Sequence, residues 1–140
     1  SGYCYAYKIN KMLEHKTNKE NIRKYLRCLE RSDYENLIGL FASSAIIHSP
    51  LYGEVEAKNF YKDLFKDTTK STISLKDIFM NEDESKGAVN FLYDWVLADG
   101  SRVSFNCVDI FKFSSEGKIK ELTIIYDTSQ TRPKFDKMKS

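Results

Sequence analysis

The sequence feature that most constrains the fold is a pair of long β-rich runs on either side of Asp99-Gly100. The runs are GAVNFLYDWVLA at residues 87–98 and RVSFNCVDIFKF at residues 102–113. An Asp-Gly dipeptide between such runs is a strong signal for a tight β-hairpin. If these two residues form the whole loop, Ala98 lies opposite Ser101, and cross-strand partners share one face of the sheet. The hairpin therefore assigns every side chain of both runs to a face.

Both faces of this predicted hairpin are rich in apolar residues, so each needs a cover. One face carries Asn90, Leu92, Asp94, Val96, Val103, Phe105, Cys107, Asp109 and Phe111. The other carries Val89, Phe91, Tyr93, Trp95, Leu97, Ser104, Asn106, Val108 and Ile110. We expect helices of the same chain to cover the first face. We expect a homodimer to cover the second, outer face through Phe91, Tyr93 and Trp95.

The segments before the hairpin are typical of helices with one short strand between them. Capping-box patterns at residues 17–20 and 32–35 start two short helices. A strand at residues 45–49 ends at a proline, and apolar spacing predicts a third helix at residues 54–65. Helices followed by a strand meander predict an α+β fold with the helices on one face of an antiparallel sheet.

The 140 residues have room for one domain. We expect an N-terminal arm at residues 1–16, a single domain at 17–132 and a polar, flexible tail at 133–140.

Composition narrows the classes of function. The net charge is +2 with interspersed charges, so nothing indicates a nucleic-acid-binding protein. No run approaches the roughly 20 apolar residues of a membrane span. The three cysteines lack C-x-x-C spacing and there are only two histidines, so we expect no disulfide framework, no metal site and no cofactor. This cysteine usage favours a reducing, cytoplasmic compartment.

Asp109 is the residue of the hairpin that most needs an explanation. A carboxylate among aromatic side chains must be paired, kept neutral or open to a cavity. The predicted register places Asp94 and Asn90 on its face, and converging polar groups in an apolar wall are typical of a ligand pocket. The same groups can instead form a structural cluster satisfied by the backbone, and Asp94 can pair with Arg102 or Lys112.

Several segments resemble the nuclear-transport-factor-2-like superfamily, whose members include ketosteroid isomerases and SnoaL-like polyketide cyclases. The resemblance rests on the order of the helices, on LFASSAIIHSPLYG at residues 40–53 and on DIFKFSSEGKI at residues 109–119. It spans about residues 21–127. It implies a cone-shaped fold, in which a strongly curved antiparallel sheet wraps around three N-terminal helices and encloses a pocket. Dimers are frequent in this superfamily.

Position by position, the resemblance to ketosteroid isomerases implies an oxygen-binding site. Tyr25 falls on their oxyanion-hole tyrosine, Asp109 on the protonated aspartic acid that shares the hole, and Tyr61 on a supporting pocket tyrosine. Ser49 falls where those enzymes have their catalytic base, so the usual base is absent. His48 points to the opposite face by strand alternation and cannot activate Ser49.

Two other carboxylates are candidates to replace that base. Asp94 shares the predicted face of Asp109, and Asp127 ends the last strand near the rim of the implied pocket. Two neighbouring carboxylates push their pKa values apart, which leaves one neutral donor and one ionised base. Asp127 can instead anchor the tail through Thr128 or Arg132.

Three functional hypotheses follow. The first is a pocket for a small, largely apolar molecule with a carbonyl or hydroxyl group. The second is an isomerase, cyclase or lyase that works through an enolate. The third is an interaction module whose pocket is filled by its own side chains. The expected catalytic residues are Tyr25, Asp109, Asp94 and Asp127, and the expected ligand-binding residues are Tyr61, Ser49, Phe105, Tyr126 and Asn90.

Overall fold

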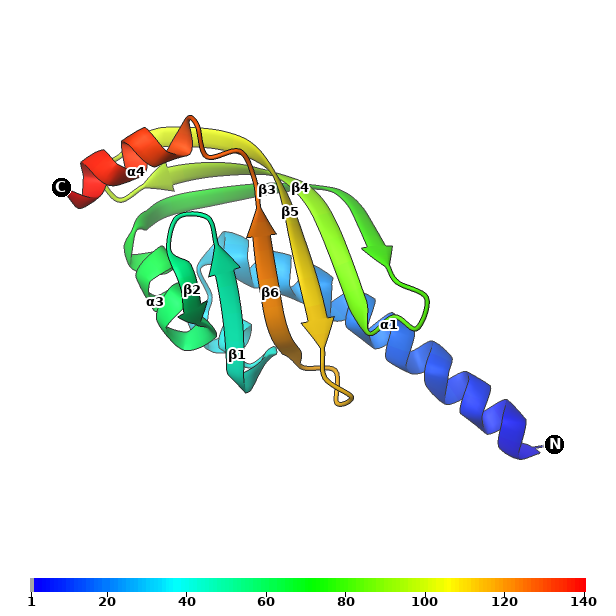
Figure 1. Cartoon of the computed structure of the whole chain (residues 1–140). Coiled ribbons are helices and arrows are strands. Elements are labelled where there is room, and N and C mark those ends of the chain that lie inside the picture. The colour runs from blue at the N-terminus through cyan, green and yellow to red at the C-terminus, as the bar shows by residue number, and fades with distance from the viewer. Residues whose placement is uncertain (1) are drawn as a thin grey trace.

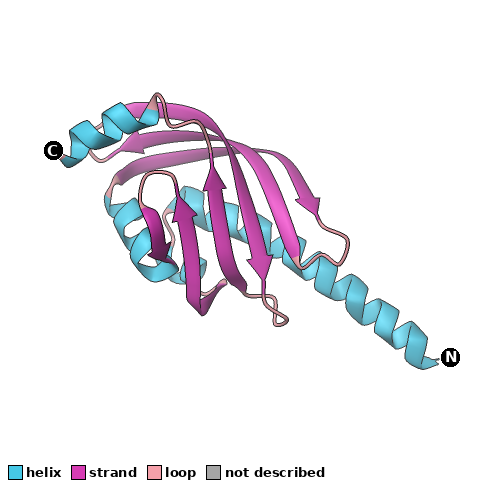
Figure 2. Cartoon of the chain, viewed as in Figure 1, coloured by secondary structure: helices cyan, strands magenta, loops and turns pink. Residues whose placement is uncertain are grey.

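A single curved sheet wraps around the helices of the N-terminal half of the chain (Figure 1). The computed structural model describes residues 2–140, except for the side chains of residues 10–17. Figure 2 shows the six strands curving over the helices without closing into a barrel. The elements are α1 (Gly2–Arg31), α2 (Tyr34–Ile38), β1 (Phe41–Ser49), β2 (Gly53–Glu56), α3 (Ala57–Lys66), β3 (Thr68–Met80), β4 (Lys86–Leu97), β5 (Arg102–Phe113), β6 (Ile119–Ile125) and α4 (Thr131–Lys139). The predicted α+β class and curved sheet are confirmed.

The strand order is β2-β1-β6-β5-β4-β3. Four of the neighbouring pairs are antiparallel, but β1 and β6 run parallel. Ile47 of β1 lies beside Leu122 of β6, and both side chains are fully buried. A parallel pair needs a long connection between its strands, and here the intervening helix and four strands provide it. The meander pattern predicted a purely antiparallel sheet, and the parallel pair of β1 and β6 contradicts that prediction.

The hairpin between β4 and β5 is shifted by one residue from the predicted register. The Leu97 backbone N–H donates to the Ser101 carbonyl oxygen at 2.8 Å, so residues 98–100 form a three-residue loop. Gly100 has φ +86°, the left-handed conformation that closes such a loop. Ala98 belongs to the loop and does not lie opposite Ser101.

This shift moves the β4 side chains to the opposite face relative to β5, because the side-chain period of a strand is two. Val89 lies opposite Asp109 and shares its concave face. Asn90 and Asp94 therefore belong to the convex face, and their predicted place beside Asp109 is wrong.

The same shift overturns the predicted dimer surface. Trp95, Tyr93 and Phe91 are only 2%, 5% and 2% exposed, because they lie in the core beneath the concave face. They cannot meet a second subunit in the folded protein. The β4 residues of the predicted outer face thus lie on the inner face, whereas its β5 residues, such as Ile110, are on the convex face as predicted.

The N-terminal segment and the first helix of the domain form one continuous helix. α1 crosses residue 17 without a break, so the capping-box pattern at residues 17–20 does not start a helix. The side chain of Thr17 is among those outside the description. Ser32 ends α1 with φ 53°, and Asp33 rather than Ser32 caps α2, where its carboxylate accepts from the Asn36 backbone N–H. Figure 1 shows the first part of α1 projecting beyond the sheet.

Two further boundaries differ from the prediction. Residues 53–56 form β2 beside β1, so α3 begins at Ala57 rather than at residue 54. The tail predicted to be loose from residue 133 contains α4, whose Phe135 is buried with its ring centroid 5.1 Å from that of Tyr52. The segment is short and polar, so its helical periodicity gives little signal.

Candidate functional site

A narrow cavity lies between α1, α3 and the concave face of the sheet. About 450 Å³ of empty space lies between its walls when the open mouth is included, but only about 50 Å³ can hold the centre of a water-sized sphere. That inner space can hold a few waters, and a larger ligand would extend from it into the open mouth. The lining residues are Tyr25, Leu29, Ser49, Leu51, Tyr52, Phe60, Leu64, Phe91, Tyr93, Trp95, Phe105, Cys107, Asp109, Ile124 and Tyr126.

Tyr25 enters the cavity from the buried stripe of α1. It packs edge-on against Phe111, with ring centroids 5.1 Å apart. Its hydroxyl oxygen lies 2.6 Å from that of Tyr61, and either hydroxyl can donate. Burial, with the neighbouring Tyr61 and Asp109, raises the pKa of Tyr25 well above its ordinary value, so the phenol remains protonated at neutral pH. Tyr61 lies behind Tyr25 on α3 and does not line the cavity.

Asp109 enters the cavity from β5 and is 1% exposed. Burial raises the pKa of its carboxyl to about 7, and the Cys107 thiol, which donates to Oδ1 at 3.3 Å, acts in the opposite direction. At neutral pH the neutral acid and the carboxylate are therefore both populated. No cation among the described residues contributes to this shift.

Tyr25 and Asp109 thus open into the same apolar cavity from opposite walls. They influence each other electrostatically, but no hydrogen bond joins them among the described residues. A phenol and a carboxylic acid that do not satisfy each other can both donate to one ligand oxygen. The arrangement can hold a carbonyl or hydroxyl oxygen, and it can stabilise negative charge that develops there.

Ser49 also lines the cavity, but its hydroxyl has a local structural role. Its Oγ accepts from the backbone N–H groups of Leu51 and Tyr52 at 3.2 and 3.1 Å, which closes the turn after β1. His48 points the other way, with its Nε2 2.9 Å from Glu121 Oε1. The serine therefore has no imidazole to activate it.

The structure does not bring the other predicted polar residues to the cavity. Asp94 is on the convex face, where it accepts from the Ser104 hydroxyl rather than pairing with Arg102 or Lys112. Asn90 is on the same convex face, and its Oδ1 is buried without a hydrogen-bond partner.

Asp127 lies in an exposed turn instead of at the cavity. Its Oδ1 accepts from the Ser129 backbone N–H at 2.9 Å, and hydrogen bonds from Ser129 lower its pKa. Its partner is therefore neither Thr128 nor Arg132. Phe105 and Tyr126 do line the cavity and stack on each other with ring centroids 3.8 Å apart.

Sequence reasoning missed several residues of the cavity wall. Tyr93 lines it, and its hydroxyl lies 2.6 Å from the buried Ser71 hydroxyl. The correct hairpin register would have placed Tyr93 beside Phe105, whose ring centroid is 5.3 Å away. Cys107 was on the face of Asp109 in the prediction, but its contact with the carboxyl was not anticipated.

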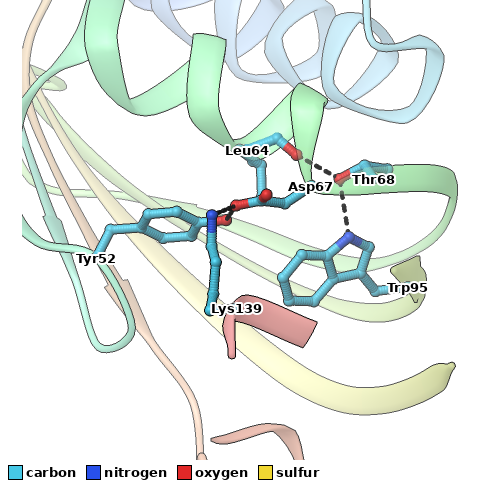
Figure 3. A network of polar contacts seen from close by, with 6 residues as sticks. All are labelled: Tyr52, Leu64, Asp67, Thr68, Trp95 and Lys139. Carbon is cyan, nitrogen blue, oxygen red and sulfur yellow. Dashed lines mark hydrogen bonds and ion pairs between the residues drawn. The ribbon is translucent and has the colours of Figure 1, made fainter. Parts of the chain in front are cut away.

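A second polar network supports the outer part of the cavity wall (Figure 3). Asp67 Oδ2 accepts from the Tyr52 hydroxyl at 2.7 Å and lies 2.6 Å from Lys139 Nζ. Trp95 Nε1 donates to Thr68 Oγ1 at 2.8 Å. Because Tyr52 and Trp95 both line the cavity, α4 and the end of α3 hold two of its walls in place.

No three histidine, cysteine, aspartate or glutamate residues gather into a possible metal site wherever side chains are described. Among residues 2–140, no helix is long and apolar enough to cross a membrane.

Comparisons with known proteins agree on the type of fold. A family model described as a SnoaL-like domain matches residues 22–122. One similar solved structure is the epoxide hydrolase/cyclase-like enzyme SalBIII, which has a role in pyran ring formation in polyether salinomycin. It is 22% identical to this chain with a TM-score of 0.72, and the match covers 81% of this chain and 93% of SalBIII.

Two further solved structures are similar. An NTF2-like protein of unknown function from Exiguobacterium sp. 255-15 is 19% identical with a TM-score of 0.68, covering 78% of this chain and 99% of its own. A putative SnoaL-like polyketide cyclase from Shewanella denitrificans OS-217 is 10% identical with a TM-score of 0.71, covering 86% and 97%. No curated protein matches the chain. At these identities the solved structures establish the fold alone.

Proposed function

Because this chain belongs to the SnoaL-like domain family of the NTF2-like superfamily, we propose that it binds a small, largely apolar molecule through a carbonyl or hydroxyl oxygen. The ligand occupies the cavity, and Tyr25 and Asp109 donate hydrogen bonds to its oxygen. The observation that carries this proposal is a buried carboxyl group with no cation beside it, open to an apolar cavity that it shares with a buried phenol. Apart from Tyr61 and Cys107, no described side chain hydrogen-bonds to this pair, so it is suited to a polar atom of a ligand.

The narrowness of the cavity favours a flat or slender ligand. Aromatic side chains form about half of the wall, including Phe91 and Trp95 from β4 and Phe105 from β5. These rings supply apolar contact, while the two donors supply orientation. Tyr61 supports Tyr25 from behind, since its hydroxyl can donate to Tyr25 and leave the Tyr25 proton for the ligand.

Phenol and toluene provide a matched test, because they have the same number of heavy atoms and only phenol carries an oxygen. We expect the wild-type protein to bind phenol more tightly than toluene in NMR titrations. Asp109→Leu and Tyr25→Phe should each reduce that preference by about tenfold, the effect of one lost hydrogen bond. Asp94→Asn, on the convex face, is the control and should change nothing. An unchanged preference in both cavity variants would contradict the proposal.

The neutral-range pKa of Asp109 favours a second function, acid–base catalysis in the same cavity. A group that titrates near the working pH is well suited to proton transfer. In this case Asp109 moves the proton, and Tyr25 stabilises the developing enolate oxygen in an isomerase, cyclase or lyase reaction. This role replaces the one predicted for Asp94 and Asp127.

Exchange of the α-protons of cyclohexanone in D₂O tests this second function. We expect the wild-type protein to accelerate exchange, with a pH profile that bends near 7, and Asp109→Asn to abolish the acceleration. If the wild-type protein exchanges the α-protons no faster than Asp109→Asn does, the catalytic proposal is wrong. The binding proposal is tested separately, by the phenol titrations.

We also propose that the convex face forms a homodimer. Ile110 and Ile125 are 37% and 48% exposed on neighbouring strands of this face, close to the buried and unpaired Asn90 Oδ1. A second copy would cover this apolar area. Sedimentation should show a dimer for the wild-type protein and for Leu75→Glu, and a monomer for Ile125→Glu. A wild-type monomer at micromolar concentration would reject the dimer.

The cytoplasmic location stays a prediction.

A further inference from the structure

One buried group of the cavity wall has no role in the function proposed above. Cys107 is 2% exposed, lines the cavity and lies on β5 two residues before Asp109. Residues two apart on a strand share a face, so the thiol and the carboxyl sit side by side. The Cys107 Sγ–H donates to Asp109 Oδ1 at 3.3 Å.

The thiol is a hydrogen-bond donor rather than a nucleophile. Burial and the neighbouring Asp109 carboxyl raise the pKa of Cys107 far above its ordinary value. Reactive cysteines need the opposite environment, in which a positive charge or a helix N-terminus stabilises the thiolate. Cys107 therefore keeps its proton at neutral pH, and that proton is available to Asp109.

We propose that Cys107 is a positioning residue that decides which oxygen of Asp109 presents the acid proton to the ligand. A neutral carboxyl group has one O–H and one carbonyl oxygen, and the oxygen that accepts the thiol hydrogen bond is the carbonyl one. Because Oδ1 accepts from Cys107, the acid proton sits on Oδ2. This inference rests on the proposed function, in which that proton is donated to a ligand oxygen.

The same hydrogen bond stabilises the ionised carboxylate. It opposes the burial of Asp109 and keeps the acid within reach of neutral pH. Among the described residues, no group that faces the carboxyl supplies a positive charge. The titratable groups that interact with it are Tyr25 on α1, Tyr61 on α3, Tyr93 on β4, Cys107 on β5 and Tyr126 after β6. All of them are neutral in their protonated form.

The test is an NMR titration of the ¹³C-labelled Asp109 carboxyl in the full chain. In Cys107→Ala the carboxylate loses its donor, so we expect the apparent pKa of Asp109 to rise by about half a unit to one unit. In Cys107→Ser a hydroxyl replaces the thiol with little change in size and is the stronger donor, so the pKa should stay or fall. Cys28→Ala, outside the cavity, is the control.

The two variants separate positioning from packing, because only Cys107→Ala removes the donor. A residue that only fills space would shift the pKa of Asp109 in the same direction in both variants. That result, or a pKa unchanged in both, overturns the proposal. The titration needs no ligand, so it can succeed or fail independently of phenol binding. If the pKa shifts occur and phenol does not bind, the hydrogen bond stands and the proposed function fails.

Binding provides the second measurement. If phenol binds, Cys107→Ala should weaken it by about twofold at pH 6, where Asp109 is mostly protonated, because the proton is then shared between the two oxygens. Cys107→Ser should restore wild-type affinity. Equal affinity of all three proteins at pH 6 would contradict the positioning role.

Discussion

Two parts of the cavity wall use the same residue types in opposite ways. At the inner end, the hydroxyls of Tyr25 and Tyr61 meet, and the Asp109 carboxyl has a thiol beside it and no cation. At the outer end, the hydroxyl of Tyr52 and the ammonium of Lys139 meet on one carboxylate oxygen of Asp67 (Figure 3).

The difference between the ends is a single positive charge. A buried carboxylate paired with an ammonium and a phenol is satisfied, and it contributes to holding α4 against the domain. A buried carboxyl without such a cation is left with a raised pKa and a cavity in front of it, which is the arrangement found at functional sites. The comparison teaches that the outer end is structural and that the inner end is the place to look for chemistry.

The largest effect that tests this contrast is the pH dependence of stability. The pKa of Asp109 is about 7 in the folded chain against about 4 when unfolded, so the unfolded state loses its proton first as pH rises. The free energy of unfolding should therefore fall by about 4 kcal/mol in total through this group as the pH rises from well below 4 to well above 7, and then level off. Asp109→Asn should remove that fall.

Urea denaturation at pH 5 and pH 7.5 should show about 2.5 kcal/mol of this fall. Asp94→Asn is the control, because Asp94 lies on the convex face and accepts from Ser104. Parallel pH profiles for the wild-type protein and Asp109→Asn would mean that the inner carboxyl is not kept neutral by burial.

The next largest effect concerns the outer ion pair. Lys139→Met keeps an apolar side chain of similar length, but it removes the ammonium that lies over the rings of Tyr52 and Phe135 and leaves the Asp67 carboxylate without its cation. We expect a loss of about 2 kcal/mol, less than for a fully buried pair because the lysine side chain is 46% exposed. Thermal unfolding measures it, and Lys137→Met on the same helix serves as the control. A cost equal to that of the control would show that the pair contributes nothing.

A smaller effect should follow from the hydroxyl pair of the inner end. Tyr61→Phe leaves the buried Tyr25 hydroxyl without its partner and should cost about 1 kcal/mol. Unlike the cost of Lys139→Met, this cost should not change with salt, because neither group is charged. Tyr34→Phe, which loses an exposed hydrogen bond to the Lys58 carbonyl, is the matched control. A salt-dependent loss would contradict a neutral pair.

The smallest effect belongs to Ser49, which lies in the cavity wall but serves its own turn. Ser49→Ala should cost about 0.5 kcal/mol through the lost bonds to Leu51 and Tyr52. Phenol affinity should stay the same within error. A large loss of affinity would assign the serine to the ligand rather than to the turn.

The sequence was informative where the pattern is local. Alternation along 102–113 places Asp109 with Cys107 on one face whatever the partner strand does, and helical spacing places Tyr25 on a buried stripe. The register between β4 and β5 depends on whether Ala98 belongs to the strand or to the loop, and the dipeptide Asp99-Gly100 fits both loop lengths. That one residue moved Asp94 and Trp95 to the wrong faces.

The outer network could not be inferred from any window of the sequence. Asp67 ends α3 and Lys139 lies near the end of α4, and only the complete fold brings them together. The polar segment after residue 130 has too short an apolar pattern to predict a helix that packs on Tyr52.

The parallel pairing of β1 and β6 also has a consequence for how the chain folds. β1 is synthesised early, yet its central neighbour β6 appears only after α3 and four more strands. Contacts between such distant segments close slowly, because the loop entropy is lost before the pairing energy is gained. During synthesis, the edge of β1 at Ile46-Ile47 stays unpaired until β6 has been made. An unpaired strand edge can pair with another chain, so the refolding yield should fall with rising protein concentration more steeply than in a fold of purely local hairpins.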